Sequence, residues 1–496
     1  MDLLKSMKYL LLLLVLMIFS CEPETEVEKG TLSGTVSLEN QTDNSGITIA
    51  IYNLAELDPE IVSVNNEYPH IGVIINQHTE FDHRLQTPIR ATTSDSNGDF
   101  EMKDIIKGTY NIVIMKQGWG FKYLYEIEIY KGDNDLTNGI ILFEEKSYSG
   151  VISENLIFET DHHYIIEDDT TLLPNLSLVI QPGAIIRINP DEDFTIHGSI
   201  KAQGTEDKMF WITSNDGFDD LYEVSLLLRD EIDIYHQMEF SPISFIEDDL
   251  IEWGKWSYGD TCLLNQVNNL KFQNAILRDA QCGFYSFLTF TEITLTDCNN
   301  ILSINNLNEN QGGIYYVGVD DGEISKSVFL NNFNGVKVKD GYMGKIQDNF
   351  LYNNTNGISI WDFSGVVQNN LLQNNIVSDI EFSGNTSENN LGFSVYFNNI
   401  SSVKGLFHNG NYSYCYFSTN YINNNNFTNS DLFLHFNSVY GLMNMNGWFD
   451  LTNNYFNGLQ NEQDIRSDIY DQNSNGEIDI IIVPFNFYEI PNIGIR

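Results

Sequence analysis

Three carboxylates in the second half of the chain have a spacing that would suit acid–base chemistry. They are Asp362, Asp379 and Glu381, which we place on neighbouring turns of a repeating fold. Two carboxyl groups held about 5–10 Å apart are the catalytic pair of a glycoside hydrolase. A solvated, non-catalytic face is the favoured alternative, because the spacing from Asp362 to Glu381 falls short of the local repeat.

A second kind of chemistry would use a basic side chain as the proton acceptor. Lys337 and Lys339 alternate onto one face of a predicted strand, and Arg278 is a third candidate base. A calcium-dependent polysaccharide lyase needs such a base beside carboxylates that hold the metal. Asp340 is the nearest acidic residue to the two lysines, and no acidic cluster recurs beside them. The sequence therefore favours a solvated face and predicts no catalytic residues.

Aromatic residues are candidate contacts to a glycan or a protein, because their side chains supply large contact areas. Trp253 and Trp256 end an acidic stretch, and Tyr412, Tyr414 and Tyr416 fall on one face of a predicted strand. Aromatic residues on strands more often belong to a core. These five residues are binding candidates if their face of the strand points outward.

Two acidic segments have some features of calcium sites. Residues 95–99 alternate Asp and Asn around a glycine, and residues 471–479 begin like a calcium-binding loop. The second segment has Ile482 where a bidentate Glu would complete the site. Turns in which side chains bond to the backbone explain both segments better. We therefore expect no cofactor, with calcium as the weaker alternative.

Apart from Cys21, the cysteines give no support to a zinc site. They are Cys262, Cys282, Cys298 and Cys415, and no Cys-x-x-Cys motif occurs. In a coil of about 20 residues per turn, neighbouring cysteines could stack on adjacent turns and form a disulfide. Buried free thiols are the favoured alternative. The nine histidines are scattered and form no ligand pattern.

The charge of the chain restricts its partners. The formal net charge is −44, from 25 basic and 69 acidic residues. Nucleic acids and anionic lipid surfaces are bound through basic patches, which this composition does not favour. A polyanionic polysaccharide would need calcium as a bridge. The sequence therefore predicts no nucleic-acid partner.

The N-terminus carries the pattern of an export signal that ends in a cysteine. Lys5 and Lys8 precede an apolar run from Tyr9 to Phe19, which is shorter than the roughly 20 residues of a membrane-spanning helix. Ser20-Cys21 resembles the lipobox of bacterial lipoproteins. The resemblance implies a signal peptide at residues 1–20 and acylation of Cys21 by chains such as palmitate. An ordinary signal peptide with an incidental cysteine is the alternative.

Residues 21–29 follow as an acidic tether. This segment resembles the export signals of surface-exposed lipoproteins in Gram-negative bacteria. The resemblance implies a protein at the cell surface, anchored to the outer membrane through its lipid. Two or three acyl chains would hold it firmly, since each buried methylene contributes about 0.8 kcal/mol.

The rest of the chain is predicted to be all-β, because short alternating runs are separated by Asn, Gly and Asp. Residues 30–145 form the first unit. Gly34-Thr35-Val36, the turn from Asp95 to Phe100, and Gly108-Thr109-Tyr110 resemble a carboxypeptidase regulatory-like domain, a transthyretin-like β-sandwich of seven strands. That resemblance implies a spacer or docking module without catalysis. The segment 53–90 is longer than the usual loop of that family.

Residues 150–458 form the second unit. Pro182-Gly183, the run from Gly198 to Thr205 and the apolar strand from Met209 to Ser214 follow one another in a characteristic order. This order closely resembles the opening turns of right-handed parallel β-helix proteins of the pectate-lyase-like superfamily. Members of that superfamily include lyases, hydrolases, epimerases and non-enzymes, so the fold does not settle the function.

A repeat of 21–22 residues supports the β-helix. At a spacing of 21 we find Phe329, Phe350 and Leu371, and also Asn332, Asn353 and Asn374. At a spacing of 22 we find Gly335-Val336, Gly357-Ile358 and Asp379-Ile380, and also Ile324 and Ile346. We expect the asparagines to stack in ladders along the coil, and the apolar faces to be buried by stacking of the turns.

Two segments depart from the repeat. Residues 215–257 interrupt it with many acidic residues, and we expect an insertion that serves as a lid, a partner surface or neutral decoration. Residues 459–496 are expected to form a C-terminal cap that blocks the open edge of the stack.

Two functions are compatible with these patterns. The first is a non-enzymatic surface lipoprotein whose β-helix is a binding or scaffold surface, for a glycan or within an outer-membrane protein complex. The second is a polysaccharide lyase or glycoside hydrolase that acts on extracellular glycans. The sequence favours the first, since no cluster of carboxylates with a base is legible.

Overall fold

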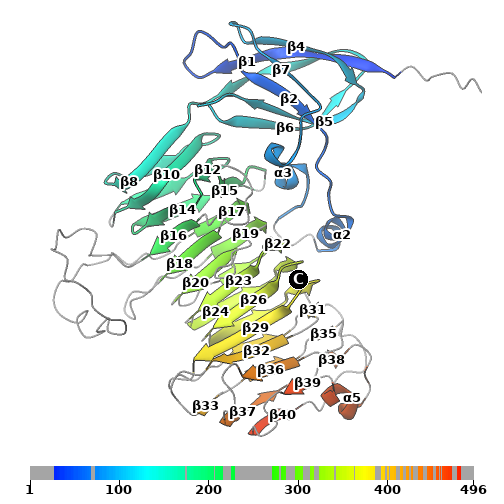
Figure 1. The fold of residues 1–496 in the computed structure, drawn as a ribbon, viewed down its shortest axis with the longest axis vertical. Coiled ribbons are helices and arrows are strands. Elements are labelled where there is room, and N and C mark those ends of the chain that lie inside the picture. Colours follow the sequence, from blue (N-terminus) through cyan, green and yellow to red (C-terminus); the bar gives the residue numbers. More distant parts are fainter. Residues whose placement is uncertain are drawn as a thin grey trace, which may run out of the picture. The chain divides into compact units, whose positions relative to one another are not determined.

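The chain folds as an all-β protein, as the sequence predicted. In the computed structural model, β-sheets near the N-terminus are followed by a long parallel β-solenoid (Figure 1). The structure describes residues 27–68, 73–173, 176–190, 192–205, 207–215, 225–229, 271–278, 281–285, 297–304, 313–317, 323–339, 342–361, 364–385, 393–396, 399–400, 403–408, 414–416, 420–423, 426–427, 434–438, 444–450, 454–456, 459, 461–467, 469–471 and 477–481.

The described residues belong to two compact units that alternate along the chain. The first contains residues 27–54, 85–116 and 121–142, and the second contains residues 55–84, 117–120 and the chain from Phe143 onward. Residues 55–84 fall within the segment 30–145, which the sequence predicted to be one unit. In the structure they belong to the same unit as the solenoid, and we call them the strap.

The N-terminal unit is a β-sandwich of two sheets. Its strands are β1 (Lys29–Leu38), β2 (Thr48–Tyr52), β3 (Arg90–Thr93), β4 (Asp99–Ile106), β5 (Gly108–Met115), β6 (Phe121–Ile129) and β7 (Gly132–Leu142). One sheet has the order β4-β1-β7, with β1 and β7 parallel, and the other has the order β3-β2-β5-β6. Alternate residues of β1 and β4 are buried, including Leu32, Val36 and Phe100, because each sheet turns one face to the core.

The acidic turn at residues 95–99 is held by its own side chains. Asp95 accepts hydrogen bonds from the backbone N–H groups of Asn97 and Asp99 at 2.8 and 3.0 Å. Gly98 has φ +90° and lies so close to β1 that a Cβ atom would be 1.9 Å from the carbonyl oxygen of Val36. The carboxylate of Asp95 thus acts as a backbone acceptor, as expected for a turn.

The solenoid begins at Lys146, and its strands pair in parallel with those of the turns before and after. The first strands are β8 (Lys146–Ile152), β9 (Leu156–Phe158), β10 (His163–Leu172), β11 (Ser177–Ile180), β12 (Ile185–Ile188), β13 (Asp193–Ile196), β14 (Ser199–Gln203), β15 (Phe210–Ser214) and β16 (Ser225–Arg229). The central strands are β17 (Lys271–Arg278), β18 (Gln281–Tyr285), β19 (Asp297–Ile304), β20 (Ile314–Val317), β21 (Glu323–Ser325), β22 (Val328–Leu330), β23 (Asn334–Lys339), β24 (Tyr342–Gln347), β25 (Phe350–Tyr352), β26 (Asn356–Trp361), β27 (Ser364–Gln368), β28 (Leu371–Gln373) and β29 (Ser378–Asn385). The last elements are β30 (Phe393–Tyr396), β31 (Asn399–Ile400), β32 (Val403–His408), β33 (Tyr414–Tyr416), β34 (Asn420–Asn423), β35 (Asn426–Phe427), β36 (Leu434–Ser438), β37 (Asn444–Asp450), β38 (Tyr455–Phe456), α5 (Glu462–Ser467), β39 (Ile469–Asp471) and β40 (Glu477–Ile481).

The interior of the coil is apolar. Ile314, Val336, Ile358 and Ile380 are register partners on four consecutive turns, and all four are completely buried. A single turn cannot bury such a face, so each turn is stabilised by its neighbours. The predicted spacing of 22 residues at these positions is confirmed.

Buried asparagines form ladders along two edges of the coil, as predicted. The side-chain oxygen of Asn354 accepts hydrogen bonds from the backbone and side-chain N–H groups of Asn332, at 3.0 and 3.1 Å. The Asn375 oxygen accepts the same two bonds from Asn354. At the other edge, Asn349 and Asn370 repeat this arrangement. Side chains thus satisfy polar groups that no water reaches.

The predicted columns at a spacing of 21 residues are right for one step and wrong by one position for another: Phe350 pairs with Leu371 as predicted, but the step before it has 22 residues. The register pairs Asn332 with Asn354, and Phe329 with Leu351. In the pairs Asn331-Asn332 and Asn353-Asn354, the first residue is exposed and has positive φ, and the second is buried. Both residues of such a pair are asparagines, and Val328 is as completely buried as Phe329. Residue type alone therefore did not distinguish a spacing of 21 residues from a spacing of 22.

The strap contains the short helices α2 (Pro59–Glu67) and α3 (Gln77–Glu80), and the 3-10 helix η1 (His83–Leu85) begins at its end. The side chain of Asp58 caps the N-terminus of α2, and Asn76 with Thr79 forms a capping box on α3. Among the residues that the structure describes, no helix is long and apolar enough to span a membrane.

Replacement of a ladder asparagine should destabilise the solenoid strongly. Asn354→Ala removes the acceptor for two N–H groups of Asn332 and the donor to the carbonyl of Phe329. We expect a loss of about 2–4 kcal/mol, because several buried polar groups lose their partner. Asn353→Gly is the control; it removes an exposed side chain but tolerates positive φ, and should cost less than about 1 kcal/mol. Calorimetric unfolding measures both, and equal losses would contradict the ladder's role.

Candidate functional site

The strands of the solenoid stack in columns of register partners, and we refer to each column as one sheet of the coil. A row of polar residues runs along the outside of one such sheet. Lys337 of β23, Ser359 of β26 and Glu381 of β29 are register partners on consecutive turns. Each is partly exposed, whereas the adjacent residues Val336 and Val338 are buried. Alternate residues of a strand point to opposite faces, so the three polar residues lie outside the coil. We call them the open ladder.

The register extends the open ladder in both directions. Tyr315 pairs with Lys337 on one side, and Lys404 pairs with Glu381 on the other. Two residues further along the same strands, a second row of register partners consists of Lys339, Trp361 and Ser383. Successive positions are about 4.8 Å apart, the distance between neighbouring strands. This sheet therefore repeats hydrogen-bonding and aromatic residue types at a fixed interval.

The structure describes two of the three candidate carboxylates, Asp379 and Glu381, and it does not bring them together at the surface. Asp379 is fully buried, and its carboxylate accepts a hydrogen bond of 2.7 Å from the side chain of Asn375. Glu381 is partly exposed on the open ladder. Asp362 lies outside the described residues. Because Asp379 is inaccessible, it cannot protonate or attack a substrate at the surface together with Glu381.

The predicted basic residues lie on two different sheets. Lys337 pairs with Tyr315 and Ser359, while Arg278 pairs with Thr213 and Ile304. Lys339 accompanies Lys337 on β23, as the alternation predicted. The structure therefore does not bring Arg278 to the lysines.

The aromatic candidates are described only in part. Tyr414 and Tyr416 belong to β33 and pair with Asn444 and Asn446 of β37, so they share one face of the strand. Tyr412, Trp253, Trp256 and the insertion 215–257, except for Asn215 and β16, lie outside the described residues, as does Cys21.

Register places three of the cysteines, and none of them pairs with another; Cys415 pairs with Met445. Cys282 pairs with Leu226 and Ile314, whereas Cys298 pairs with Phe272 and Ile324. The disulfide alternative, which required Cys282 and Cys298 to stack on adjacent turns, is therefore not supported. Their separation is shorter than one turn of the coil, which places them on different strands of the turn.

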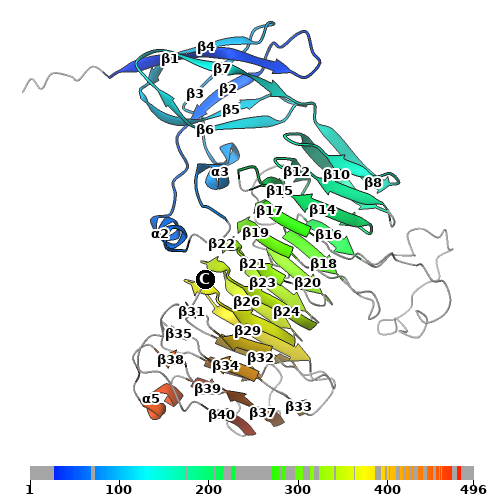
Figure 2. The same cartoon turned by 180° about the vertical axis from the view of Figure 1, so that it is seen from behind.

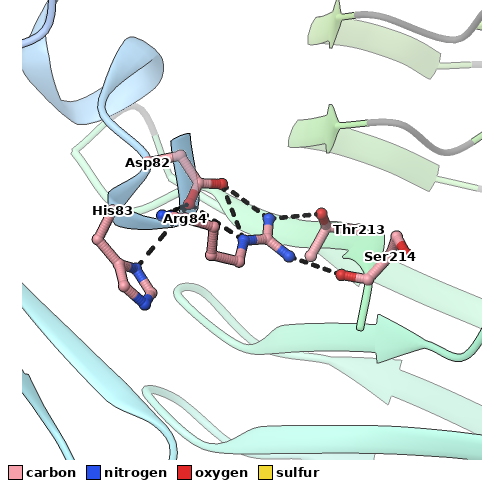
Figure 3. Close-up of polar contacts among 5 residues, drawn as sticks. All are labelled: Asp82, His83, Arg84, Thr213 and Ser214. Carbon is pink, nitrogen blue, oxygen red and sulfur yellow. Dashed lines mark hydrogen bonds and ion pairs between the residues drawn. The ribbon is translucent and has the colours of Figure 1, made fainter. Parts of the chain in front are cut away.

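Sequence reasoning missed a second group of polar residues, where the strap meets β15 (Figure 3). The Arg84 guanidinium donates to the backbone oxygen of Ser214 at 2.6 Å and to the Thr213 hydroxyl at 2.8 Å. Asp82, whose side chain is completely buried, accepts bonds from both the Nε and an Nη atom of Arg84. The unusual length of segment 53–90 was the one signal of such a contact.

The environment of His83 disfavours its charged form. Burial lowers the pKa of His83 from 6.5 to about 4, and the nearby cations Arg84 and Arg187 act in the same direction. The Asp82 carboxylate, 3.9 Å from Nδ1, opposes this shift without overcoming it. His83 is therefore neutral at pH 7, so this group is suited to holding the strap rather than to binding an anion.

The described residues contain no group of three or more His, Cys, Asp or Glu side chains that could hold a metal ion. His162 stacks on Phe143 at 4.1 Å, and its Nδ1 lies 2.9 Å from the backbone oxygen of Thr160. His163 is buried. Most residues of the acidic segment 471–479 lie outside the described set.

Comparison with known proteins finds no family model, no curated protein and no solved structure that matches this chain.

The buried His83 should make stability depend on pH. In the unfolded chain its pKa is near 6.5, and in the folded chain it is about 4, so the unfolded state binds the proton first. Its contribution is complete above pH 6.5 and declines as the pH falls to 4, by about 3 kcal/mol in total. His83→Gln should remove this part of the pH dependence, and His78→Gln, at an exposed site, should keep it. Urea unfolding at several pH values would contradict the assignment if the two variants behaved alike.

Proposed function

We propose that this protein is a lipid-anchored surface protein whose solenoid is a rigid, non-catalytic binding surface. The observation that carries the proposal is the open ladder of Lys337, Ser359 and Glu381, which lies in register on consecutive turns. Side chains fixed at one spacing can contact an extended or flat partner without reordering on binding, which lowers the entropic cost of association. The surface would serve as a scaffold within an outer-membrane protein complex, or hold a glycan.

The N-terminal features support attachment to the outer membrane. The pattern before Cys21 and the acidic tether after it favour an acylated, surface-exposed lipoprotein. The two sheets of the first unit are compatible with a carboxypeptidase regulatory-like module that acts as a spacer. The solenoid is compatible with a right-handed β-helix of the pectate-lyase-like kind.

Catalysis is the less favoured function. A retaining or inverting glycosidase needs two accessible carboxyl groups. Asp379 is buried and bonded to Asn375, so it cannot partner Glu381. A calcium-dependent lyase needs a base beside several carboxylates. Among the described positions of the open ladder, Lys337 and Lys404 accompany one carboxylate, Glu381.

Acylation is tested at Cys21. Cys21→Ser should abolish lipid attachment and release the protein from the membrane fraction, because the anchor supplies the affinity for the bilayer. Cys262→Ser is the control and should stay in that fraction. Mass spectrometry of the N-terminal peptide checks the modification. An unmodified Cys21 in membrane-bound protein would contradict the lipoprotein assignment.

The binding surface is tested by affinity purification of the lipidated protein from its native outer membrane. We expect a stoichiometric partner, and the double variant Lys337→Ala/Glu381→Ala should lower its recovery about tenfold, since each lost charge-assisted bond weakens binding. Lys345→Ala, an exposed lysine of β24 on another sheet, is the control.

Two outcomes of this purification would contradict the proposal. Equal recovery of the partner with the double variant would place the interface outside the open ladder. A protein that is recovered alone and cleaves a polysaccharide would refute the non-catalytic function.

A further inference from the structure

The strap contacts the solenoid at two points that lie on one ladder. At one end Arg84 bonds to Thr213 of β15, and at the other end the Tyr352 hydroxyl of β25 donates to Glu60 of α2 at 2.9 Å. The register leads from Thr213 to Tyr352 through Arg278, Ile304 and Leu330. Four steps of about 4.8 Å separate the contacts, so the strap spans about 19 Å along the coil.

The outer face of this sheet is apolar and buried. On β12, Arg187 is partly exposed and Ile188 is buried, which makes Thr213, the register partner of Arg187, an outer position. The register then assigns four more outer positions, and their exposed fractions are 5% for Trp211, 0% for Val328, 2% for Leu330 and 0% for Phe350. Side chains at these outer positions would be exposed to water if nothing packed on the sheet. Another layer of the chain therefore covers them.

The strap has apolar side chains that can form this covering layer. Its buried apolar side chains are Ile61, Val64, Val73, Ile75 and Phe81. It is braced internally, because the side chain of Gln77 bonds to both backbone groups of Ala55, and Asn65 bonds to the backbone of Val73 and Ile75. Figures 1 and 2 both show α3 beside β15 and α2 beside β22.

The two ends of the strap are held unequally. At the Arg84 end, the side chain of Asp82 is completely buried and that of Arg84 is 14% exposed. At the α2 end, Glu60 is exposed, and α2 buries two side chains, Ile61 and Val64. Segments with little buried surface and exposed hydrogen bonds open at the lowest free energy.

We infer that the strap is a hinged cover, which stays attached at Arg84 and opens from α2. Opening uncovers the apolar strip of Val328, Leu330 and Phe350 on the outer face of β22 and β25. The protein thus has a second surface, closed at rest, on the sheet that the open ladder does not occupy. The inference does not depend on the proposed function, because it concerns contacts within the chain.

Hydrogen exchange of the full mature chain tests the hinge. Glu60→Ala and Tyr352→Phe each remove the bond between α2 and β25, and we expect amide exchange in α2 to rise about threefold in each variant. The double variant should exchange no faster than the faster single variant, since both changes break one interaction. Exchange near Arg84 should be unchanged. Glu56→Ala, which removes an exposed glutamate just before α2, is the control and should match the wild type.

A second variant tests the fixed end. Arg84→Ala should raise exchange along the whole strap and increase the fluorescence of an apolar dye, because the strip is then uncovered more often. Two results would overturn the hinged cover. One is an equal acceleration at α2 and near Arg84 in the Glu60→Ala variant, which would mean that the strap moves as one body. The other is wild-type exchange in α2 for both Glu60→Ala and Tyr352→Phe.

Discussion

The hydrogen bonds of the buried asparagines are the interaction on which the central turns of the solenoid depend. Each turn bends sharply at its edges, and a residue with positive φ at each bend, such as Asn331 or Asn353, leaves the next backbone N–H without a strand partner. The side-chain oxygen of Asn354 accepts that N–H from Asn332. An unpaired N–H at such a buried position would cost about 1–3 kcal/mol. The ladder therefore allows short strands to stack with a dry interior.

The stacking of the strands also determines how residue types are arranged on the outside of the coil. Because the register is maintained from turn to turn, each outer position becomes a column whose character is set by a few residue types. One sheet has a polar column that includes Lys337 and Glu381, while the sheet under the strap has an apolar column that includes Val328 and Phe350. The first can face water, and the second requires a cover. The apolar outer column of this sheet thus explains why the strap packs on it.

The sequence predicted the fold better than the site, for reasons that can be stated residue by residue. A spacing of 22 between Val336 and Ile358 reflects a steric requirement that each turn repeats, so it is legible in composition. The exact pairing of the asparagines was not legible in the composition, because Asn353 and Asn354 are the same residue type in different conformations. The contact of Arg84 with Thr213 was not predicted, since Arg84 belongs to no repeat and lies 129 positions from its partner.

Asp379 shows why a carboxylate at a suggestive spacing need not be catalytic. Each ladder asparagine uses one N–H of its side chain to bond a backbone oxygen and the other to bond the next asparagine, as Asn354 does with Phe329 and Asn375. Asn375 donates to the backbone oxygen of Leu351 and to the Asp379 carboxylate. The carboxylate occupies the acceptor role that the next asparagine oxygen has on the earlier turns. A buried acceptor ends the row without leaving a donor unpaired, and this structural requirement accounts for an acidic residue at position 379.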